Sequence, residues 1–578
     1  MNQKGQLSAI VIIALLIITG IAIYFVISNS EVIYDKCDIN GDGNIDIKEK
    51  TNCGKMVKPP VNNVIKPTLN QTKPPITNKI NETTSNPNPI PNPDPIPFGN
   101  LSLYEDSPFG LAIDFNEVEL RIALDIGYSD ALSPTSYYLN DLGIRWIRPV
   151  IFWDLVENEF GYLNFSSLDY QARDMHVHGI RAIHTFISDN PHDNQLCHST
   201  SCAMPCNEAD YINFIRKTVE RYDGDSDYGC DFSAPDCYRT GDNQYPSVET
   251  RNAIINAPWT NWELGNEEDN PMFFRPCVEG QQLEEYSHLL QITQPAVKAA
   301  CANCKMILGG LTSVFSDSAS VPAPPSRYFL DIMEFVTQNL NYLDVVNYHV
   351  YGILPISYEQ MKYYSDRYSG SKEIVITEMG SFSRIVSEGK NPYSVTPFSE
   401  SSQAQELVKR VSTALYYDVK IIDWFNLMDG PPLTNIAVKS GQEMAYGLID
   451  ADAIKKLSYY TYKLMIEKLE ESNLDEVQTI SNLPVNVYAY RFVNKNTGNP
   501  TYVVWWEYWA EPSATSKTVN IAVSGISENA LVTEAIPKYL SGAQVTNFAA
   551  AFNTETRTVS NGQVSLVLGE NPVYVEQG

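Results

Sequence analysis

The sequence is poor in positive charge and has only one long hydrophobic run. Its 578 residues include 41 Lys and Arg against 69 Asp and Glu, so the net charge is −28. A surface of this sign repels phosphate backbones and other anionic polymers, which excludes nucleic acid as an expected partner. Hydrophobic residues make up 43% of the chain and charged residues 19%, a balance typical of folded soluble domains and not of a multi-spanning membrane protein.

Cysteines are few but clustered. Of the ten, eight fall between Cys197 and Cys304. The even number and the crowding favour disulfides formed in an oxidising compartment. A zinc site is the alternative, because Cys197, His198, Cys202 and Cys206 are all potential ligands, but their spacing lacks paired C-x2-C knuckles. We therefore expect disulfides, whose pairing the sequence does not define.

The one long apolar run, Ser8–Ile27, has the ~20 residues that a helix needs to cross a bilayer. Lys4 precedes it and Glu31 and Asp35 follow, so the expected topology places the N-terminus inside and the rest of the chain outside. A cleaved secretory signal is the alternative, but no small-x-small site follows the run. The segment KGQLSAIVII also resembles archaeal pilin-type signal peptides, in which cleavage after Gly5 leaves the apolar helix attached. We expect a retained membrane anchor.

A short loop rich in Asp and Asn follows this segment. It has the register of an EF-hand loop, with oxygen ligands, a backbone carbonyl at the seventh position and Gly43 at the sharp turn. Cys37 and Cys53 flank it and are positioned to close it by a disulfide. The loop resembles half of a dockerin module, and we expect it to bind structural Ca²⁺ through Asp38, Asn40, Asp42, Asn44, Asp46 and Glu49.

The composition divides the chain into five parts. Residues 1–30 are the expected anchor or pilin-like segment and residues 31–54 the calcium loop. Residues 55–102 are rich in Pro, Asn and Thr, which predicts an extended spacer. Residues 103–470 are the expected catalytic domain, with a Cys-rich insertion at 189–256. Residues 471–578 contain short alternating strands, which predict a β-sandwich.

In the central part, short β-branched runs alternate with amphipathic stretches, the pattern of a parallel α/β fold. Two of these stretches, Glu279–Ala300 and Ser402–Tyr417, have helical character. Eight βα units predict a (β/α)8 barrel, in which functional residues lie at the carboxyl ends of the strands. The expected strands are Phe109–Phe115, Ile144–Val150, Ala182–Phe186, Trp259–Leu264, Met306–Leu311, Val345–His349, Ile374–Thr377 and Ile421–Phe425.

Two carboxylates stand at the ends of predicted strands. Asn-Glu occurs five times, but only Asn266-Glu267 follows the fourth predicted strand, and Glu378 ends the seventh. Cleavage of an acetal requires one protonated and one ionised carboxyl group, so such a pair fits that chemistry. These positions resemble the clan A glycoside hydrolases, including the family 5 (cellulase) and family 39 types, whose acid/base ends strand four in an Asn-Glu pair and whose nucleophile ends strand seven. The sequence departs from this pattern in the long Cys-rich insertion at 189–256, which has no counterpart in the compact members of the clan.

The resemblance extends to other strand ends. It implies that Glu267 is the acid/base and Glu378 the nucleophile, and that Arg148 lies beside Glu378 and keeps it ionised. It further implies that Asn266 binds the sugar 2-hydroxyl, that Tyr351 of His349-Val-Tyr351 hydrogen-bonds the nucleophile, and that Trp424 forms an aromatic floor. Alone, each has a structural alternative: Trp424 as core, His349 as a satisfied core histidine and Arg148 as a barrel ion pair.

The expectation for the whole chain is a retaining O-glycosidase at the cell surface that acts on a poly- or oligosaccharide by double displacement. No cofactor is expected for catalysis. Two alternatives remain open, an inactive barrel that binds glycans as a lectin or adhesin, and a structural, pilus-like surface subunit. The sequence does not define the sugar or the linkage.

Overall fold

The computed structural model describes residues 107–113, 134–158, 162–194, 196, 202–225, 246–270, 273–312, 315–316, 324–352, 354–383, 399–429, 445–511 and 513–578. The apolar run Ser8–Ile27, the calcium loop Asp38–Glu49, the linker and residues 226–245 of the insertion lie outside the described residues. No helix within the described ranges is both long and apolar enough to cross a membrane. The anchor and the calcium site therefore stay predictions.

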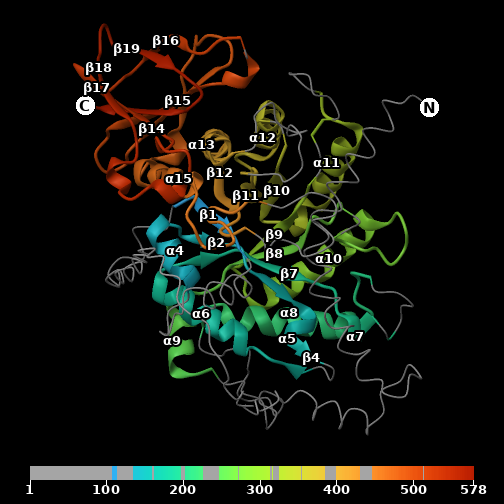
Figure 1. Cartoon of the computed structure of the whole chain (residues 1–578). Helices are drawn as coiled ribbons and strands as arrows, with labels where there is room; N and C mark the ends of the chain where they lie inside the picture. The colour runs from blue at the N-terminus through green and yellow to red at the C-terminus, as the bar shows by residue number, and fades with distance from the viewer. Residues whose placement is uncertain are drawn as a thin grey trace, which may run out of the picture. The chain divides into compact units, whose positions relative to one another are not determined.

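A curled parallel sheet forms the centre of the fold (Figure 1). Its ten segments follow the order β3-β7-β8-β9-β10-β11-β12-β1-β2-β6. The segments are β1 (Phe109–Ala112), β2 (Trp146–Ile147), β3 (Val150–Phe152), β6 (Arg181–Ala182), β7 (His184–Ile187), β8 (Asn261–Asn266), β9 (Lys305–Gly310), β10 (Val345–Val350), β11 (Glu373–Met379) and β12 (Val419–Phe425).

The two ends of this order are joined through the chain itself. Segments β2 and β3 are separated only by Arg148 and Pro149, and β6 and β7 only by Ile183. Since β2 pairs with β6 and β3 with β7, both in parallel, the sheet curls back on itself. Proline has no N–H to donate, which accounts for the break after Arg148. This mixed α/β architecture is TIM-like.

Helices lie around the sheet (Figure 1). Neighbouring helices pack on one another, α8 on α10, α6 on α9, and α13 on both α12 and α15. Ser399 caps α13 through a capping box with Ser402, which satisfies backbone N–H groups that a helix start leaves free. The helices are α4 (Pro134–Leu142), α5 (Trp153–Val156), α6 (Ser166–His178), α7 (Pro191–Asn194), α8 (Glu208–Tyr222), α9 (Val248–Asn256), α10 (Gln282–Ala300), α11 (Arg327–Asn339), α12 (Leu354–Tyr368), α13 (Glu400–Tyr416) and α15 (Leu457–Leu469).

The C-terminal part is rich in β-structure. One antiparallel sheet has the order β13-β14-β15-β20-β17-β18, and β16 pairs with β19 in a second. An apolar cluster that includes Val504, Val519 and Leu566 fills the space between them. The strands are β13 (Gln478–Thr479), β14 (Val487–Val493), β15 (Pro500–Trp506), β16 (Lys517–Ala522), β17 (Asn529–Glu534), β18 (Thr554–Thr558), β19 (Gln563–Leu568) and β20 (Val573–Gln577).

This β-rich part shares its core with the α/β part. Trp505 and Tyr574 belong to the same apolar cluster as the barrel residues Trp424 and Leu464. A buried ion pair also joins them, because the Lys409 ammonium lies 3.1 Å from a carboxyl oxygen of Glu507. Tyr358 of α12 donates a further hydrogen bond to Glu507, at 2.9 Å. The two parts therefore form one packed body.

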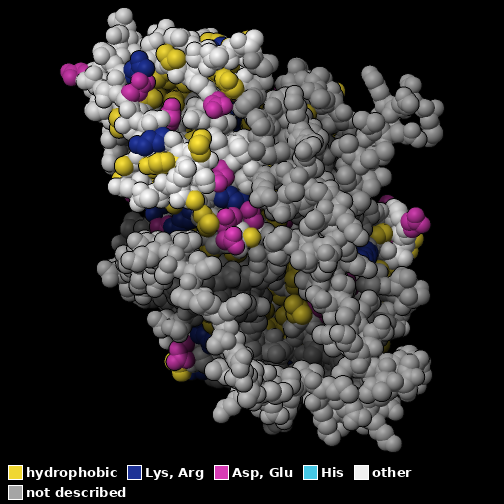
Figure 2. Space-filling view, viewed as in Figure 1, with side chains coloured by type: hydrophobic (Ala, Val, Ile, Leu, Met, Phe, Trp, Pro, Cys, Tyr) yellow, Lys and Arg dark blue, Asp and Glu magenta, His cyan; other side chains and the backbone are white. Residues whose placement is uncertain are grey.

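Two disulfides are defined in the described residues. Cys202 pairs with Cys277 and Cys301 with Cys304. None of the described cysteines is free, which agrees with disulfides as opposed to zinc thiolates. Figure 2 shows charges of both signs and scattered hydrophobic side chains on the visible face of the C-terminal β-structure.

Candidate active site

The predicted polar site residues come from the β2–β3 connection and from the carboxyl ends of β8, β10 and β11 of the curled sheet. Arg148 lies between β2 and β3, Asn266 ends β8 and Glu267 follows it directly. His349 lies in β10, and Glu378 lies near the end of β11. Parallel strands present their carboxyl ends on one edge, so the fold brings together side chains that are up to 230 positions apart in sequence.

Glu378 is held by two donors. Arg148 donates from Nη1 to Oε1 at 2.7 Å, and the Tyr351 hydroxyl donates to Oε2, also at 2.7 Å. Burial raises the pKa of Glu378, whereas the charge of Arg148 and the hydrogen bond from Tyr351 act in the opposite direction. Both contacts stabilise the ionised form, as a nucleophilic carboxylate requires.

Glu267 is placed differently. It is buried, and its backbone adopts a positive φ of 60°, a conformation that non-glycine residues rarely take. Burial raises its pKa well above the usual value, and the charges of Glu378 and Asp269 act in the same direction. In the described residues, no cation forms an ion pair with Glu267 apart from a protonated His349. The surroundings therefore favour a carboxyl group that keeps its proton.

His349 lies between the two carboxyl groups. Its Nδ1 is 2.8 Å from Oε1 of Glu267 and 3.6 Å from Oε2 of Glu378. Burial lowers its pKa well below the usual value, and the charge of Arg148 adds to this, so the imidazole is neutral. The ring fits because position 310 is glycine, where a Cβ would come within 1.9 Å of Nε2.

A third carboxylate, Glu263, organises this region, and the sequence analysis assigned it no role. It is fully buried in β8 and accepts hydrogen bonds from Arg148 Nε and Nη2 at 2.5 and 3.0 Å. Further donors are Thr185 Oγ1, the Gly310 N–H, Asn347 Nδ2 and Thr377 Oγ1. Its position in the middle of β8, directly before Leu264, gave no signal, because a mid-strand carboxylate becomes informative only when its neighbours across the sheet are known.

Asn266 lies beside the same arginine. Its side-chain oxygen accepts a hydrogen bond from Arg148 Nη2 at 2.9 Å, and its backbone N–H donates to Glu268 at 2.7 Å. Asp423 also shares this interior. It is fully buried, neither carboxyl oxygen has a hydrogen-bond partner among the described residues, and burial raises its pKa well above the usual value.

Trp424 is in a different environment from the one that its predicted role requires. The side chain is fully buried in the apolar core, so it presents no face to a sugar ring. Side chains alternate along a strand, so Phe425 shares the side of Asp423, and it is only partly buried. Phe425 contacts Tyr446, which in turn contacts Tyr351. This geometry does not favour the predicted sugar contact of Trp424, and the aromatic group beside Glu378 consists of Tyr351, Phe425 and Tyr446.

Glu267, His349 and Glu378 each offer one ligand atom within 4.8 Å of the others, so the cluster has the spacing of a metal site. Arg148 already places a positive charge on Glu378, and His349 is already paired with Glu267. A second cation there would be repelled by the arginine. The donor set fits acid–base chemistry better than metal binding.

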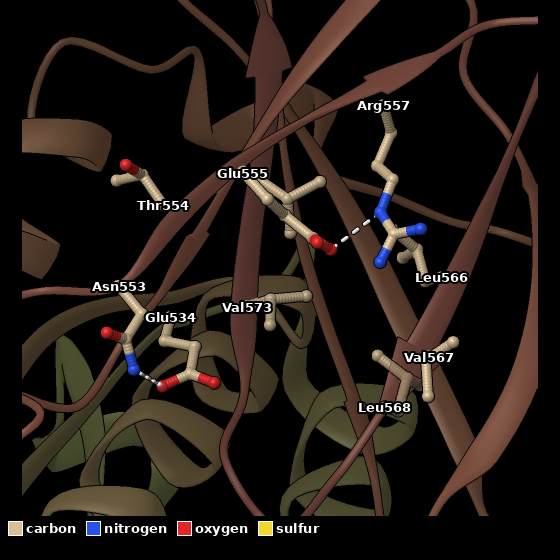
Figure 3. Close-up of a pocket in the computed structure, with 10 residues that line it drawn as sticks. Glu534, Asn553, Thr554, Glu555, Arg557, Leu566, Val567, Leu568 and Val573 are labelled. Carbon is tan, nitrogen blue, oxygen red and sulfur yellow. Dashed lines mark hydrogen bonds and ion pairs between the residues drawn. The ribbon is translucent and has the colours of Figure 1, made fainter.

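A separate concavity of about 270 Å³ lies in the C-terminal β-structure (Figure 3). It is lined by residues of β17, β18 and β19. The polar groups are paired with each other, Arg557 with Glu555 and Asn553 with Glu534. None of its lining residues is aromatic, so it lacks the flat apolar face on which a sugar ring stacks.

No family model matches the sequence, and no curated protein matches it either. Among solved structures, the chain is similar to a family 39 glycoside hydrolase from the gut symbiont Bacteroides cellulosilyticus WH2, with 14% identity, a TM-score of 0.52, and coverage of 82% of this chain and 81% of that one. A glucosidase from Croceicoccus marinus is 10% identical, with a TM-score of 0.49 and coverage of 82% and 96%. A glycoside hydrolase family 30 subfamily 8 xylanase from Clostridium acetobutylicum is 12% identical, with a TM-score of 0.45 and coverage of 81% and 96%. The first similarity shows the fold, a TIM-like α/β sheet.

Proposed function

We propose that the chain is a retaining glycoside hydrolase with a (β/α)8 barrel and a C-terminal β-sandwich, which cleaves O-glycosidic bonds of a poly- or oligosaccharide. One observation carries the proposal. Glu267 directly follows β8 and Glu378 lies near the end of β11, and one carboxyl oxygen of each lies within 4.8 Å of the other. A retaining pair is ~5 to 5.5 Å apart, whereas an inverting pair needs ~6.5 to 9.5 Å to admit a water molecule. The similarity to a family 39 glycoside hydrolase is in keeping with this function.

In the first step, Glu378 attacks the anomeric carbon and the bond from that carbon to the leaving oxygen breaks. Arg148 and Tyr351 hold the two carboxylate oxygens in place and keep the group ionised before attack. The product of this step is a glycosyl-enzyme ester.

Glu267 supplies the proton that the departing oxygen takes up. In the second step, the same carboxylate removes a proton from water, which attacks the anomeric carbon and releases Glu378. His349, neutral and 2.8 Å from Oε1 of Glu267, positions the carboxyl group in both steps. Asn266 is expected to bind the sugar 2-hydroxyl beside Arg148.

The proposal also covers the membrane attachment and calcium binding of the N-terminal part. We place the catalytic domain outside the cell, held at the membrane through Ser8–Ile27 and separated from it by the Pro-rich linker. Structural Ca²⁺ at Asp38–Glu49 stabilises the region next to the anchor. A glycan-binding protein without turnover remains the second candidate, and the two differ in one measurement, hydrolysis.

The test is a panel of aryl glycosides and polysaccharides with Glu378→Ala, Glu267→Ala and the wild type. Glu378→Ala should lose about three orders of magnitude in kcat, and azide or formate should partly restore turnover by taking the place of the carboxylate. Glu267→Ala should lose about 10²- to 10⁴-fold on natural glycosides but much less on activated aryl glycosides, which need little proton assistance.

Glu373→Ala is the matched control, because Glu373 begins the same strand as Glu378 and forms an exposed ion pair with Lys305 at 2.7 Å. It should leave both steps unchanged. Full activity in both Glu267→Ala and Glu378→Ala would contradict the assignment. Glycan binding by a wild type that hydrolyses nothing on the panel would favour the lectin.

A further inference from the structure

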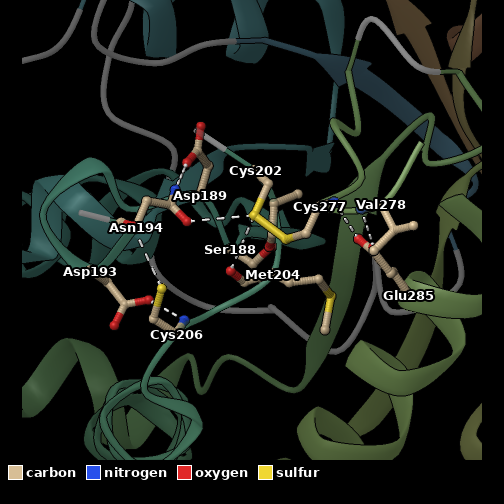
Figure 4. The surroundings of a disulfide bond; sticks show 11 residues. Ser188, Asp189, Asp193, Asn194, Cys202, Met204, Cys206, Cys277, Val278 and Glu285 are labelled. Carbon is tan, nitrogen blue, oxygen red and sulfur yellow. Dashed lines mark hydrogen bonds between the residues drawn. A yellow bond between two sulfur atoms is a disulfide. The ribbon is translucent and has the colours of Figure 1, made fainter. Parts of the chain in front are cut away.

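The Cys202–Cys277 disulfide, whose surroundings Figure 4 shows, joins the segment after β7 to the segment after β8, which begins with the predicted acid/base Glu267. Cys202 lies in the segment after β7, and Cys277 lies ten residues beyond Glu267, in the segment after β8. The two cysteines are 75 positions apart in sequence. The bond therefore connects the carboxyl ends of adjacent strands, at the edge of the sheet that bears Glu267.

A hydrogen-bonded bridge runs parallel to the disulfide. The Ala203 N–H donates to the Arg275 carbonyl at 2.8 Å, and the Ala203 carbonyl accepts from Ser188 Oγ at 2.7 Å. Ser188 is buried and follows β7 directly. The loop after β8 is thus tied to the end of β7 through Ala203 as well as through sulfur.

The loop after β8 is also fixed along its own length. The Asn270 N–H donates to the Glu267 carbonyl at 2.7 Å, and the Phe274 N–H donates to the Asn270 carbonyl at 3.0 Å. The Phe274 side chain is buried. At the far end, the N–H of Cys277 donates to the Glu285 carboxylate of α10 at 2.7 Å. Hydrogen bonds thus fix this segment both next to Glu267 and at Cys277.

Glu267 needs such a restraint. Its positive φ is a conformation that an L-residue with a side chain leaves readily when its surroundings loosen. The donor of a proton must also stay within hydrogen-bond reach of the leaving oxygen, and a displacement of about 1 Å is enough to slow the step strongly.

We propose that the Cys202–Cys277 disulfide and the Ser188–Ala203–Arg275 bridge are positioning elements that hold Glu267 in place for proton donation. This inference rests on the proposed function, since it assigns the bridge to one carboxyl group of the glycosidase pair. Glu378 is held instead by Arg148 and Tyr351, which come from other segments of the sheet. Loss of the bridge should therefore weaken acid assistance and spare nucleophilic attack.

The test compares two leaving groups on one sugar. The substrates are the 2,4-dinitrophenyl and phenyl glycosides of the sugar that the wild type hydrolyses best. In the Cys202→Ser/Cys277→Ser variant, kcat/KM on the phenyl glycoside should fall about tenfold further than on the dinitrophenyl glycoside, because only the phenolate of higher pKa needs the proton. The alkaline limb of its pH profile should also move to lower pH, since a loosened Glu267 gains water and its pKa drops toward the usual value.

Cys301→Ser/Cys304→Ser is the matched control. That disulfide links the end of α10 to the start of β9, at the opposite end of the strands from Glu267. It should change kcat/KM on both substrates by the same factor. Ser188→Ala removes only the Oγ hydrogen bond to Ala203 and leaves both disulfides intact, so it reports on the bridge should the cysteine variant fail to fold.

These measurements distinguish failure of the inference from failure of the proposed glycosidase function. A wild type inactive on both glycosides would overturn the proposed function and this inference with it. An active wild type whose Cys202→Ser/Cys277→Ser and Ser188→Ala variants lose equally on both leaving groups would overturn the inference alone. A selective loss on the phenyl glycoside in either variant, absent from the control, would support it.

Discussion

Arg148 bridges two carboxylates with different tasks, Glu263 and Glu378. Its Nη1 lies 2.7 Å from Glu378, while Nε and Nη2 both face Glu263. Glu263 is fully buried and Glu378 is largely so. The buried carboxylate fixes the guanidinium in one orientation, and the guanidinium then presents its remaining edge to the partly accessible carboxylate.

The first prediction concerns Glu263→Gln. The amide NH2 of the introduced Gln is itself a donor, and it would face the six donor atoms from which Glu263 now accepts hydrogen bonds. The substitution also removes the main negative charge that balances Arg148. We expect the free energy of unfolding to fall by about 3 to 5 kcal/mol, the usual cost of breaking a buried pair from one side. Urea denaturation measures this, and Glu373→Gln, in an exposed pair, should change it by less than about 1 kcal/mol. If Glu263→Gln changed the free energy of unfolding as little as Glu373→Gln, the hydrogen bonds of Glu263 would be dispensable for stability.

The second prediction concerns Tyr351→Phe. The Tyr351 hydroxyl donates to Glu378 and lowers its pKa, so its removal should raise that pKa. In the proposed mechanism the reactive form of Glu378 is the carboxylate, so the acidic limb of kcat/KM should move to higher pH by about one unit, the equivalent of a hydrogen bond to a charged group. Tyr446→Phe keeps the ring that contacts Tyr351 and serves as the comparison. An unshifted acidic limb in Tyr351→Phe would contradict this role.

The third prediction concerns acid stability and His184. The ring is fully buried, lies 3.7 Å from the Trp259 ring, and burial lowers its pKa well below 6.5. Because the folded pKa is depressed, the unfolded chain binds a proton that the folded chain does not, and stability is lost as pH falls below about 6.5. The contribution is at most about 1.4 kcal/mol per pH unit.

His184→Phe should therefore make the free energy of unfolding depend less on pH between pH 6.5 and 5, by the equivalent of about one bound proton. Denaturation at several pH values measures this dependence. The apolar ring retains the stacking on Trp259, so the variant should fold. A slope equal to that of the wild type would indicate that other groups govern acid unfolding.

The fourth prediction concerns calcium. Because Asp38–Glu49 fills every ligand position of the loop, a Cys37–Gly54 peptide with its disulfide formed should bind Ca²⁺ in preference to Mg²⁺. Calorimetry measures the affinity, and Asp38→Ala in the same peptide is the control. Chelation of the full chain should leave hydrolysis unchanged, since the candidate site consists of an acid–base pair held by an arginine. If no heat of binding were observed at millimolar Ca²⁺, the loop would not be a Ca²⁺ site.

Much of the α/β fold was predictable from local sequence. The predicted strands Met306–Leu311 and Val345–His349 differ by one residue at each bound from the observed β9 and at one bound from β10. The predicted strand Ile144–Val150 is interrupted, because Pro149 follows Arg148 and cannot donate to the ladder. Apolar periodicity indicates where a strand lies. Where that strand is interrupted depends on the neighbouring strands with which it pairs.

The site was predictable only in part. The sequence predicted Glu267 and Glu378 as a pair because polar residues at strand ends are informative by position alone, and the structure places one carboxyl oxygen of each within 4.8 Å of the other; their roles stay predictions. Glu263 was missed, because its importance depends on hydrogen-bond donors from five other segments of the sheet. Trp424 and Phe425 differ by one position, and the choice between them depends on which side of β12 faces the interior, which a strand buried on both sides does not reveal.

The core shared by the barrel and the C-terminal β-structure has a consequence for synthesis of the chain. Lys409 finds its carboxylate partner in Glu507, 98 positions later, and the apolar cluster of the α/β part includes Tyr574 of β20. While the ribosome is still adding these residues, the outer faces of α12 and α13 remain uncovered. The α/β part therefore completes its packing only after β20 has been synthesised, and a chain truncated before Tyr574 would leave apolar surface of the α/β part exposed.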